Sequence, residues 1–255
     1  MIDRARLEAI CSQAGAMAMN LWPGGGHALR HWSKGAAGPV SDADLMVDAF
    51  LKRELTALLP AAGWLSEETV DAPDRLQRDL VWLVDPIDGT RDFIRGRPGW
   101  CVSVALVSAG RPLMATLVAP ARHEVWSATA GAGAFLNGER LTASTRTELP
   151  GARIPADSLP RSDADLVAVA KPNSIALRIA MVADDRADLL VTQRWGHEWD
   201  IAAAILIARE AGAAVSDANG ATITFNKRVP QDWGVLACAP ALHRAAVARW
   251  GGAIS

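Results

Sequence analysis

The sequence predicts a mixed α/β protein whose first half is α+β and whose second half is α/β. Apolar residues three and four positions apart are typical of amphipathic helices, and they recur in two segments of the first 60 residues. Short apolar runs bounded by Gly, Pro, Asn and Asp are typical of strands, and they follow one another between residues 63 and 138. After residue 165 the helical and strand patterns alternate, which favours an α/β arrangement.

The first half is expected to contain two helices followed by five strands. A helix is predicted over 2–21, and the glycines after Pro23 end it. A polar loop follows over 31–39. Ser41 begins a second helix, which reaches about residue 59. The remaining predicted elements are strands over 63–65, 81–84, 102–107, 113–118 and 124–128, and a hairpin-like turn over 131–138.

The second half is separated from the first by a polar segment, residues 144–165, which contains three prolines. Such a composition is typical of a domain boundary, so the sequence predicts two domains, residues 1–145 and 146–255. The elements expected after the boundary are strands over 166–170, 187–192, 213–216 and 233–238, and helices over 174–183, 200–211 and 240–250.

The composition limits the classes of partner. Lys and Arg total 26 and Asp and Glu total 28, so the formal net charge is −2, and no basic stripe is present to attract a nucleic acid polymer. No run of about 18 uncharged apolar residues occurs, so no membrane span is expected. The N-terminus shows no secretory signal, and the three cysteines match neither a metal clip nor a disulfide framework. These features predict a cytoplasmic protein.

The segment Asp85-Pro86-Ile87-Asp88-Gly89-Thr90 carries the most chemical information. The apolar run before it suits a strand that delivers Asp85 to its end, and Pro86, which has no N–H to donate, is expected to turn the chain there. Two carboxylates held close together repel unless a cation lies between them, and hard divalent cations prefer such oxygen ligands. The amides from Gly89 onward can begin a helix and bind a phosphate. A surface turn is the alternative interpretation.

Other acidic residues have an ordinary interpretation when each is taken alone. Glu67 and Glu68 follow a predicted strand and suit a solvated charge pair. Asp44 suits the first turn of a helix, and Asp200 suits an N-cap. Lys34 is compatible with an ordinary positive charge in a surface loop.

Taken in order, these motifs resemble the inositol monophosphatase superfamily, which includes inositol monophosphatases, 3'(2'),5'-bisphosphate nucleotidases and fructose-1,6-bisphosphatase-like enzymes. The order is Asp-Leu-x-x-Asp, Ser-Glu-Glu, Asp-Pro-Ile-Asp-Gly-Thr and Trp-Asp-Ile-Ala-Ala, and the resemblance extends from about Lys34 to Ala239. It implies a layered α-β-α-β-α sandwich. It also implies a cluster of two or three Mg²⁺ ions and, as in some relatives, a homodimer.

The resemblance assigns roles to individual residues. It implies that Mg²⁺ is held by the carboxylates of Glu67, Asp85, Asp88 and Asp200 and by the carbonyl of Ile87. It implies catalytic roles for Glu67, Thr90 and Asp44. It implies phosphate or substrate contacts for Asp88, Gly89, Thr90, Lys34, Gln193 and Asp200.

The implied activity is Mg²⁺-dependent, lithium-sensitive hydrolysis of a small phosphate ester by a metal-activated water. Gln193 stands where inositol monophosphatases have an acidic residue, and Arg91-Asp92-Phe93 looks more like the nucleotidases, so a 3'(2'),5'-bisphosphate nucleotide is the favoured substrate. The cations Arg91, Arg95, Lys171 and Arg194 are candidates to meet its second phosphate. Three alternatives stay open: an inositol or other polyol phosphatase, a non-catalytic regulatory protein on the same fold, and a structural Ca²⁺ site.

Overall fold

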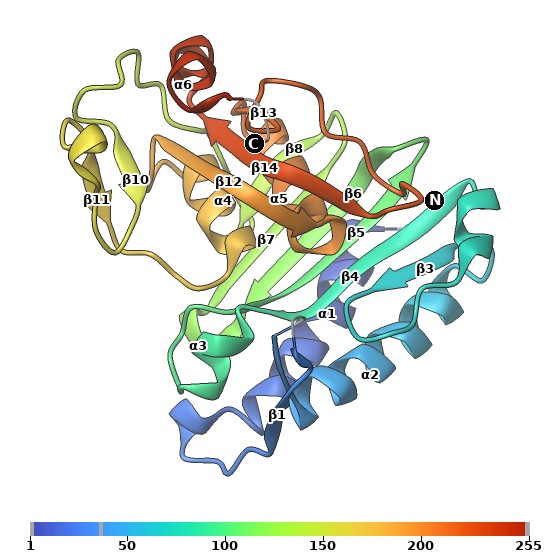
Figure 1. Ribbon diagram of the computed structural model, residues 1–255. Helices are drawn as coiled ribbons and strands as arrows, with labels where there is room; N and C mark the ends of the chain where they lie inside the picture. Colours follow the sequence, from blue (N-terminus) through green and yellow to red (C-terminus); the bar gives the residue numbers. More distant parts are fainter. Residues whose placement is uncertain (1–2, 36–37, 253–255) are drawn as a thin grey trace.

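The computed structural model describes residues 3–35 and 38–252, which form stacked layers of helices and sheets (Figure 1). The helices are α1 (Arg4–Met19), α2 (Asp42–Leu58), α3 (Thr90–Ile94), α4 (Ile175–Ala183), α5 (Glu198–Glu210) and α6 (His243–Trp250). The first strands are β1 (His31–Ser33), β2 (Pro39–Ser41), β3 (Gly63–Ser66), β4 (Leu80–Asp88), β5 (Cys101–Ser108), β6 (Arg111–Ala119) and β7 (Glu124–Thr129). The later strands are β8 (Gly133–Leu136), β9 (Glu139–Arg140), β10 (Arg153–Pro155), β11 (Val167–Val169), β12 (Leu189–His197), β13 (Ala214–Ser216) and β14 (Gln231–Cys238).

A seven-stranded sheet in the order β3-β4-β5-β6-β7-β8-β9 forms the centre of the molecule. Only β3 and β4 pair in parallel, and every later neighbour pairs antiparallel. Because β3 and β4 run side by side in the same direction, their carboxyl ends, and the acidic residues that follow, meet at one edge of the sheet.

Helices α1 and α2 cover one face of this sheet, and α4 and α5 cover the other (Figure 1). Helix α5 is apolar almost all round, which suits a helix buried between two sheets. Its far side packs on a three-stranded antiparallel sheet in the order β12-β14-β13, which α6 covers in turn. The layers are therefore α-β-α-β-α, and the predicted fold class is confirmed.

Strand β4 corrects the prediction that the chain turns at Pro86. The strand continues to Asp88, and its pairing with β5 is irregular between Asp85 and Asp88. Because a bulge leaves residues outside the ladder, Pro86 needs no N–H there. The chain turns instead at Gly89, whose φ of +95° is strained for any residue with a Cβ.

Three further segments differ from the sequence prediction. The expected loop over 31–39 contains β1 and the first residue of β2, and these two strands pair antiparallel. Residues 36–37 lie outside the described part. The polar segment 144–165 contains β10, which pairs in parallel with β11. The first helix ends at Met19, and its predicted start at residue 2 lies outside the described residues. Short polar strands lack the apolar alternation that reveals strands in a sequence.

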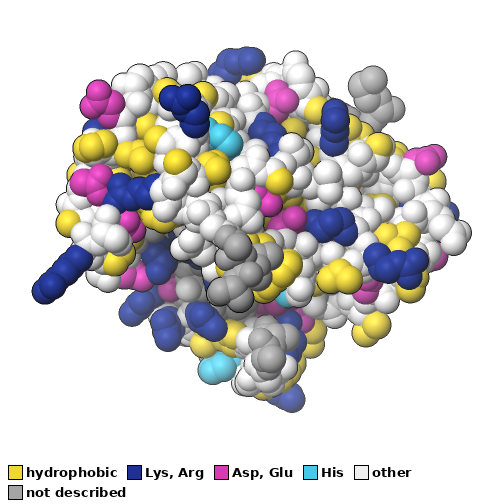
Figure 2. Space-filling view, turned by 45° about the horizontal axis from the view of Figure 1, so that its top comes forward, with side chains coloured by type: hydrophobic (Ala, Val, Ile, Leu, Met, Phe, Trp, Pro, Cys, Tyr) yellow, Lys and Arg dark blue, Asp and Glu magenta, His cyan; other side chains and the backbone are white. Residues whose placement is uncertain are grey.

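The predicted division at residue 145 stays a prediction. Buried residues from both sides of it, such as Leu117 and Ile205, belong to one hydrophobic core. Within the described part of the chain, no helix has the length and apolarity needed to cross a bilayer. Lys and Arg side chains are scattered among Asp and Glu on the face shown in Figure 2.

Candidate active site

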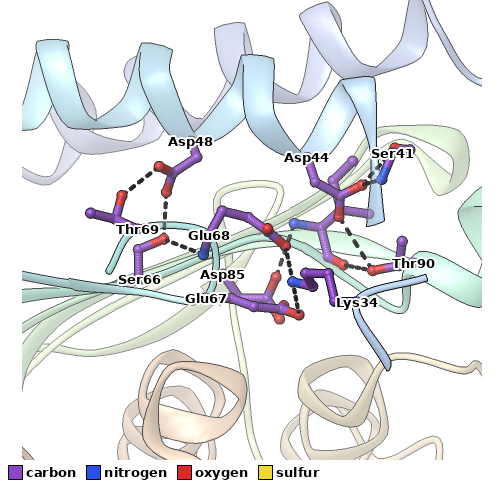
Figure 3. Close-up of polar contacts among 11 residues, drawn as sticks. Lys34, Ser41, Asp44, Asp48, Ser66, Glu67, Glu68, Thr69, Asp85 and Thr90 are labelled. Atoms are coloured by element: carbon purple, nitrogen blue, oxygen red, sulfur yellow. Dashed lines mark hydrogen bonds and ion pairs between the residues drawn. The ribbon is translucent and has the colours of Figure 1, made fainter. Parts of the chain in front are cut away.

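Three carboxylates from distant parts of the chain meet at the edge of the main sheet. Glu67 directly follows β3, Asp85 lies on β4, and Asp200 lies in the first turn of α5. Each offers one oxygen, and these oxygens lie within 4.8 Å of one another. Figure 3 shows Glu67 and Asp85 turned toward the same place. The parallel pairing of β3 with β4 creates this proximity, and α5 adds the third group.

The surroundings of these carboxylates disfavour negative charge. Asp85 is 2 % exposed, and burial raises its pKa well above the ordinary value, with further contributions from the charges of Glu67 and Asp88. Burial raises the pKa of Glu67 to about 7; Lys34 opposes this rise and Glu68 adds to it. Burial also raises the pKa of Asp200, and the negative charge of Asp88 raises it further. Such a concentration of acids is stabilised by a bound cation.

Asp88 does not belong to this group of three carboxylates. Hydrogen bonds from the protein hold its carboxylate in place. Its Oδ2 accepts a bond from the Ser174 hydroxyl and one from the Ala176 N–H at 2.7 Å. These donors fix the carboxylate against the start of α4. They oppose the rise in the pKa of Asp88 that burial causes.

Gly89 allows the chain to turn in a confined space after Asp88. A Cβ at this position would lie 2.7 Å from the Gly99 carbonyl oxygen and 2.9 Å from the Ser174 nitrogen. Helix α3 begins directly after this turn, as the sequence predicts, so the amides after Asp88 stand at the cavity wall. Both the positive φ and the close backbone contact require glycine.

Thr90 connects the motif to helix α2. Its hydroxyl donates to the Ile87 carbonyl at 3.0 Å, and its Oγ1 lies 3.3 Å from Asp44 Oδ1 (Figure 3). Asp44 Oδ2 accepts the Ser41 N–H at 2.8 Å in a capping box at the start of α2. Burial raises the pKa of Asp44 to about 6, although the Ser41 bonds oppose the rise.

Lys34 reaches the carboxylates from the hairpin of β1 and β2. Its Nζ lies 2.6 Å from Glu68 Oε1 and 3.2 Å from Glu67 Oε1 (Figure 3). Asp48 accepts hydrogen bonds from the hydroxyls of Ser66 and Thr69, which fix the segment around Glu67 against α2. The acidic segment is therefore anchored from two sides.

A cavity of about 420 Å³ opens in front of these groups. Its walls include seven of the predicted site residues: Glu67, Asp85, Ile87, Asp88, Gly89, Thr90 and Asp200. Lys34 and Asp44 contact this set through Glu67 and Thr90. Gln193 does not line the cavity, because its side-chain amide turns away and donates to the Trp250 carbonyl at 2.7 Å.

The cavity also has four cations on its walls: Arg91, Lys171, Arg178 and Arg194. Three of them are among the sequence candidates, whereas the fourth candidate, Arg95, lines a different cavity. Sequence reasoning missed Arg178, which lies within the apolar helix α4, one helical turn after Ser174. It also missed the role of Ser174 as a donor to Asp88.

The donor set fits a hard divalent cation. Carboxylate oxygens, with a backbone carbonyl beside them, are the ligands that Mg²⁺ and Ca²⁺ prefer. Lys34 is the one cation in the described part of the chain that forms an ion pair with Glu67, and none pairs with Asp85 or Asp200. The site therefore has room for positive charge.

Comparisons with known proteins agree with this geometry. The model of the inositol monophosphatase family matches residues 4–251. An inositol monophosphatase of Dictyostelium discoideum is 36% identical over 213 residues, covering 76% of this chain and 78% of that protein. A Nus factor SuhB of Xylella fastidiosa is 36% identical over 197 residues, covering 71% and 70%.

Solved structures show the same fold. The extragenic suppressor protein SuhB of Bartonella henselae has a TM-score of 0.83 at 28% identity and covers 98% of each chain. An inositol monophosphatase (IMPase) of Thermotoga maritima has a TM-score of 0.82 at 26% identity, covering 97% of this chain and 96% of that one. With the match of the family model over nearly the whole length, the chain belongs to the inositol monophosphatase family, whose members are phosphoric monoester hydrolases.

Proposed function

We propose that this chain is a Mg²⁺-dependent phosphatase that hydrolyses a small, doubly phosphorylated ester, with a 3'(2'),5'-bisphosphate nucleotide as the favoured substrate. The observation that carries the proposal is one cavity lined both by the carboxylates of Glu67, Asp85, Asp88 and Asp200 and by four Lys or Arg side chains. The carboxylates suit metal ions, and the cations suit a substrate with more than one anionic group.

Glu67, Asp85, Asp88 and Asp200, with the carbonyl of Ile87, are the groups that would hold Mg²⁺. When bound, the metal lowers the pKa of water and stabilises charge on the phosphoryl and leaving oxygens. Within the protein, Asp88 is pre-positioned by the Ser174 hydroxyl and the Ala176 N–H. Asp88 therefore needs little rearrangement.

The attacking water is oriented by Glu67 and Thr90. The Thr90 hydroxyl donates to Ile87 and lies beside Asp44, so its direction is fixed. A bound cation stabilises the ionised form of Glu67, whose carboxylate is then available to accept a proton from the water. The amides after Asp88 bind phosphate oxygens as charge develops on them.

The main alternative substrate is an inositol or other polyol monophosphate. The names of several relatives favour it, among them the inositol monophosphatase of Dictyostelium discoideum and the inositol-1-monophosphatase of Rhizobium meliloti, which is 34% identical over 206 residues. A regulatory role beside catalysis is a further candidate, because the relative from Xylella fastidiosa is named a Nus factor.

One assay separates these candidates. Phosphate release from adenosine 3',5'-bisphosphate, inositol 1-phosphate and fructose 1,6-bisphosphate is measured side by side with Mg²⁺, with EDTA, and with Li⁺ added. We expect the nucleotide to have the highest kcat/KM, and we expect EDTA to abolish turnover and Li⁺ to inhibit it. A higher kcat/KM for inositol 1-phosphate would make the polyol phosphatase the better assignment. No turnover of any ester would leave the regulatory role.

A further inference from the structure

The resemblance implies a substrate contact for Gln193, but its neighbour Arg194 is the residue that lines the cavity. Strand β12 pairs regularly with β14 up to Thr192 and again from Trp195, but the register shifts between them. Gln193 and Arg194 therefore lie in a bulge. The Gln193 amide bonds the carbonyl of Trp250, whereas Arg194 lines the cavity together with Asp200.

A second arginine, Arg178, comes to the same cavity from α4. Arg178 is only 8 % exposed. Its Nε donates to the Ser174 carbonyl at 3.1 Å and its Nη2 to the Asn173 carbonyl at 2.8 Å. These bonds fix the orientation of the guanidinium but do not neutralise it.

The two guanidinium groups lie within electrostatic reach of each other. Burial lowers the pKa of Arg178, and the positive charge of Arg194 lowers it further, while Asp88 opposes the effect. Among the described residues, neither arginine forms an ion pair with a carboxylate, in contrast to Lys171, which pairs with Asp157. Arg178 is buried near the charges of Asp88, Asp157 and Asp92, whereas Arg194 is exposed at the cavity wall. Because neither guanidinium is paired with a carboxylate, both have N–H groups that can bind an anion in this part of the cavity.

We infer that Arg178 and Arg194 form an anion-binding subsite beside the metal carboxylates, and that this subsite takes the second phosphate of the substrate. The inference rests on the proposed function. A guanidinium presents several N–H donors in a plane, which matches the oxygens of a phosphate better than the hydroxyls of a polyol. Arg194 is thus the specificity-determining residue of β12.

A matched pair of nucleotides tests the subsite. Adenosine 3',5'-bisphosphate and adenosine 3'-monophosphate differ only in the second phosphate. We expect Arg194→Ala to raise KM for the bisphosphate roughly tenfold more than KM for the monophosphate, because one charge-assisted contact is lost. Arg194→Lys keeps the charge and is expected to restore part of the difference.

Two variants serve as comparisons. Arg244→Ala removes an equal charge from the exposed side of α6, and both KM values are expected to stay at the wild-type level. Gln193→Ala is expected to leave the ratio of the two KM values constant. An equal change of both KM values in Arg194→Ala, or a change of the ratio in Gln193→Ala alone, would overturn the subsite.

The subsite can be tested separately from the proposed activity. If the wild-type protein hydrolyses inositol 1-phosphate but neither nucleotide, the proposed substrate is wrong, and the two nucleotides are compared as competitive inhibitors. If no ester is hydrolysed, the two nucleotides are titrated calorimetrically with Mg²⁺ present. In both cases the subsite requires tighter binding of the bisphosphate, and loss of that preference in Arg194→Ala; equal binding by the two nucleotides refutes it.

Discussion

Asp88 is a proposed metal ligand whose carboxylate is held by the start of helix α4. Ser174 and Ala176 hold one of its oxygens, so an amide in its place retains the acceptor that these donors need. The charge, however, is lost. We expect Asp88→Asn to lower kcat/KM on the order of 100-fold or more. Phosphate release with Mg²⁺ measures the loss.

The melting temperature of Asp88→Asn, followed by circular dichroism, is the control. It should stay close to that of the wild type in EDTA, because the packing around residue 88 is preserved. An active Asp88→Asn protein would remove Asp88 from the proposed metal ligands.

At the residue scale, the sequence indicated which residues are candidates for the site better than it indicated which way each side chain points. The motif identified Asp85, Asp88 and Thr90, because strand ends and turns concentrate polar residues in a readable way. It did not show which of Gln193 and Arg194 faces the cavity. That direction depends on a bulge, and a shift of one residue in a strand moves a side chain to the opposite face.

At the scale of elements, a fully buried arginine connects the segment after β3 with the segment that is bonded to the start of α5. Arg75, in the short helix Pro73–Gln77, donates to Asp71, to the Asn226 side chain at 2.6 Å and to the Lys227 carbonyl at 3.0 Å. Glu198, the first residue of α5, accepts the N–H groups of Asn226 and Lys227. The segment after β3 is thereby tied to the helix that carries Asp200.

We expect Arg75→Ala to destabilise the protein by about 3 kcal/mol, because it leaves a cavity and buried groups without partners. Urea unfolding followed by circular dichroism measures the change. Arg78→Ala, in an exposed pair with Asp74, is the matched control and should cost less than about 1 kcal/mol. An equal effect of the two substitutions would show that the buried network contributes little.

A second link between elements predicts a dependence on pH. Asp188 is 2 % exposed, accepts the Arg153 N–H at 2.7 Å and pairs with the Arg153 guanidinium. Burial raises the pKa of Asp188, but the bonds from Arg153 and Ser144 outweigh it and lower the pKa to about 2. Because the folded state lowers this pKa, the pair stabilises the protein above the ordinary pKa of 3.8.

This stabilisation is lost as the pH falls from about 4 to about 2. We expect Asp188→Asn to cost about 1–2 kcal/mol at pH 7, since solvent near Arg153 screens part of the interaction. The cost should shrink below pH 4, and urea unfolding at pH 7 and pH 3 measures it. A cost that is constant over this range would assign the effect to packing instead.

At the scale of the whole molecule, the three carboxylates Glu67, Asp85 and Asp200 bring together the main sheet and helix α5. Without a cation, the raised pKa values of Glu67, Asp85 and Asp200 mean that the folded state binds more protons than the unfolded one. The metal-free protein therefore loses stability as the pH rises from about 4 through the folded-state values, which for Glu67 is about 7.

Mg²⁺ is expected to reverse that loss, because it stabilises the ionised carboxylates. The rise in melting temperature on adding Mg²⁺ should be larger at pH 8 than at pH 6. Calorimetric scans with Mg²⁺ and with EDTA at the two pH values measure it. An equal rise in melting temperature at both pH values would show that Mg²⁺ does not bind through these carboxyl groups.

The class of the layered fold could be predicted from the sequence, but the pairing and packing of its elements could not. Periodicity located the long helices and buried strands, because apolar spacing is a local property. Strands β1, β2 and β10 were missed, since such short strands carry no such pattern, whereas β11 falls within the strand predicted over 166–170. The convergence of Glu67 with Asp200 depends on long-range packing, and the family resemblance alone implied it.

The position of the carboxylates along the chain has a consequence for biogenesis. Two members of the trio, Glu67 and Asp85, are synthesised early, whereas Asp200 follows more than a hundred residues later on α5. A ribosome must therefore translate beyond α5 before a nascent chain can assemble the trio. Assembly of the complete trio is therefore a late event in synthesis, and a fragment released before α5 would lack the third carboxylate.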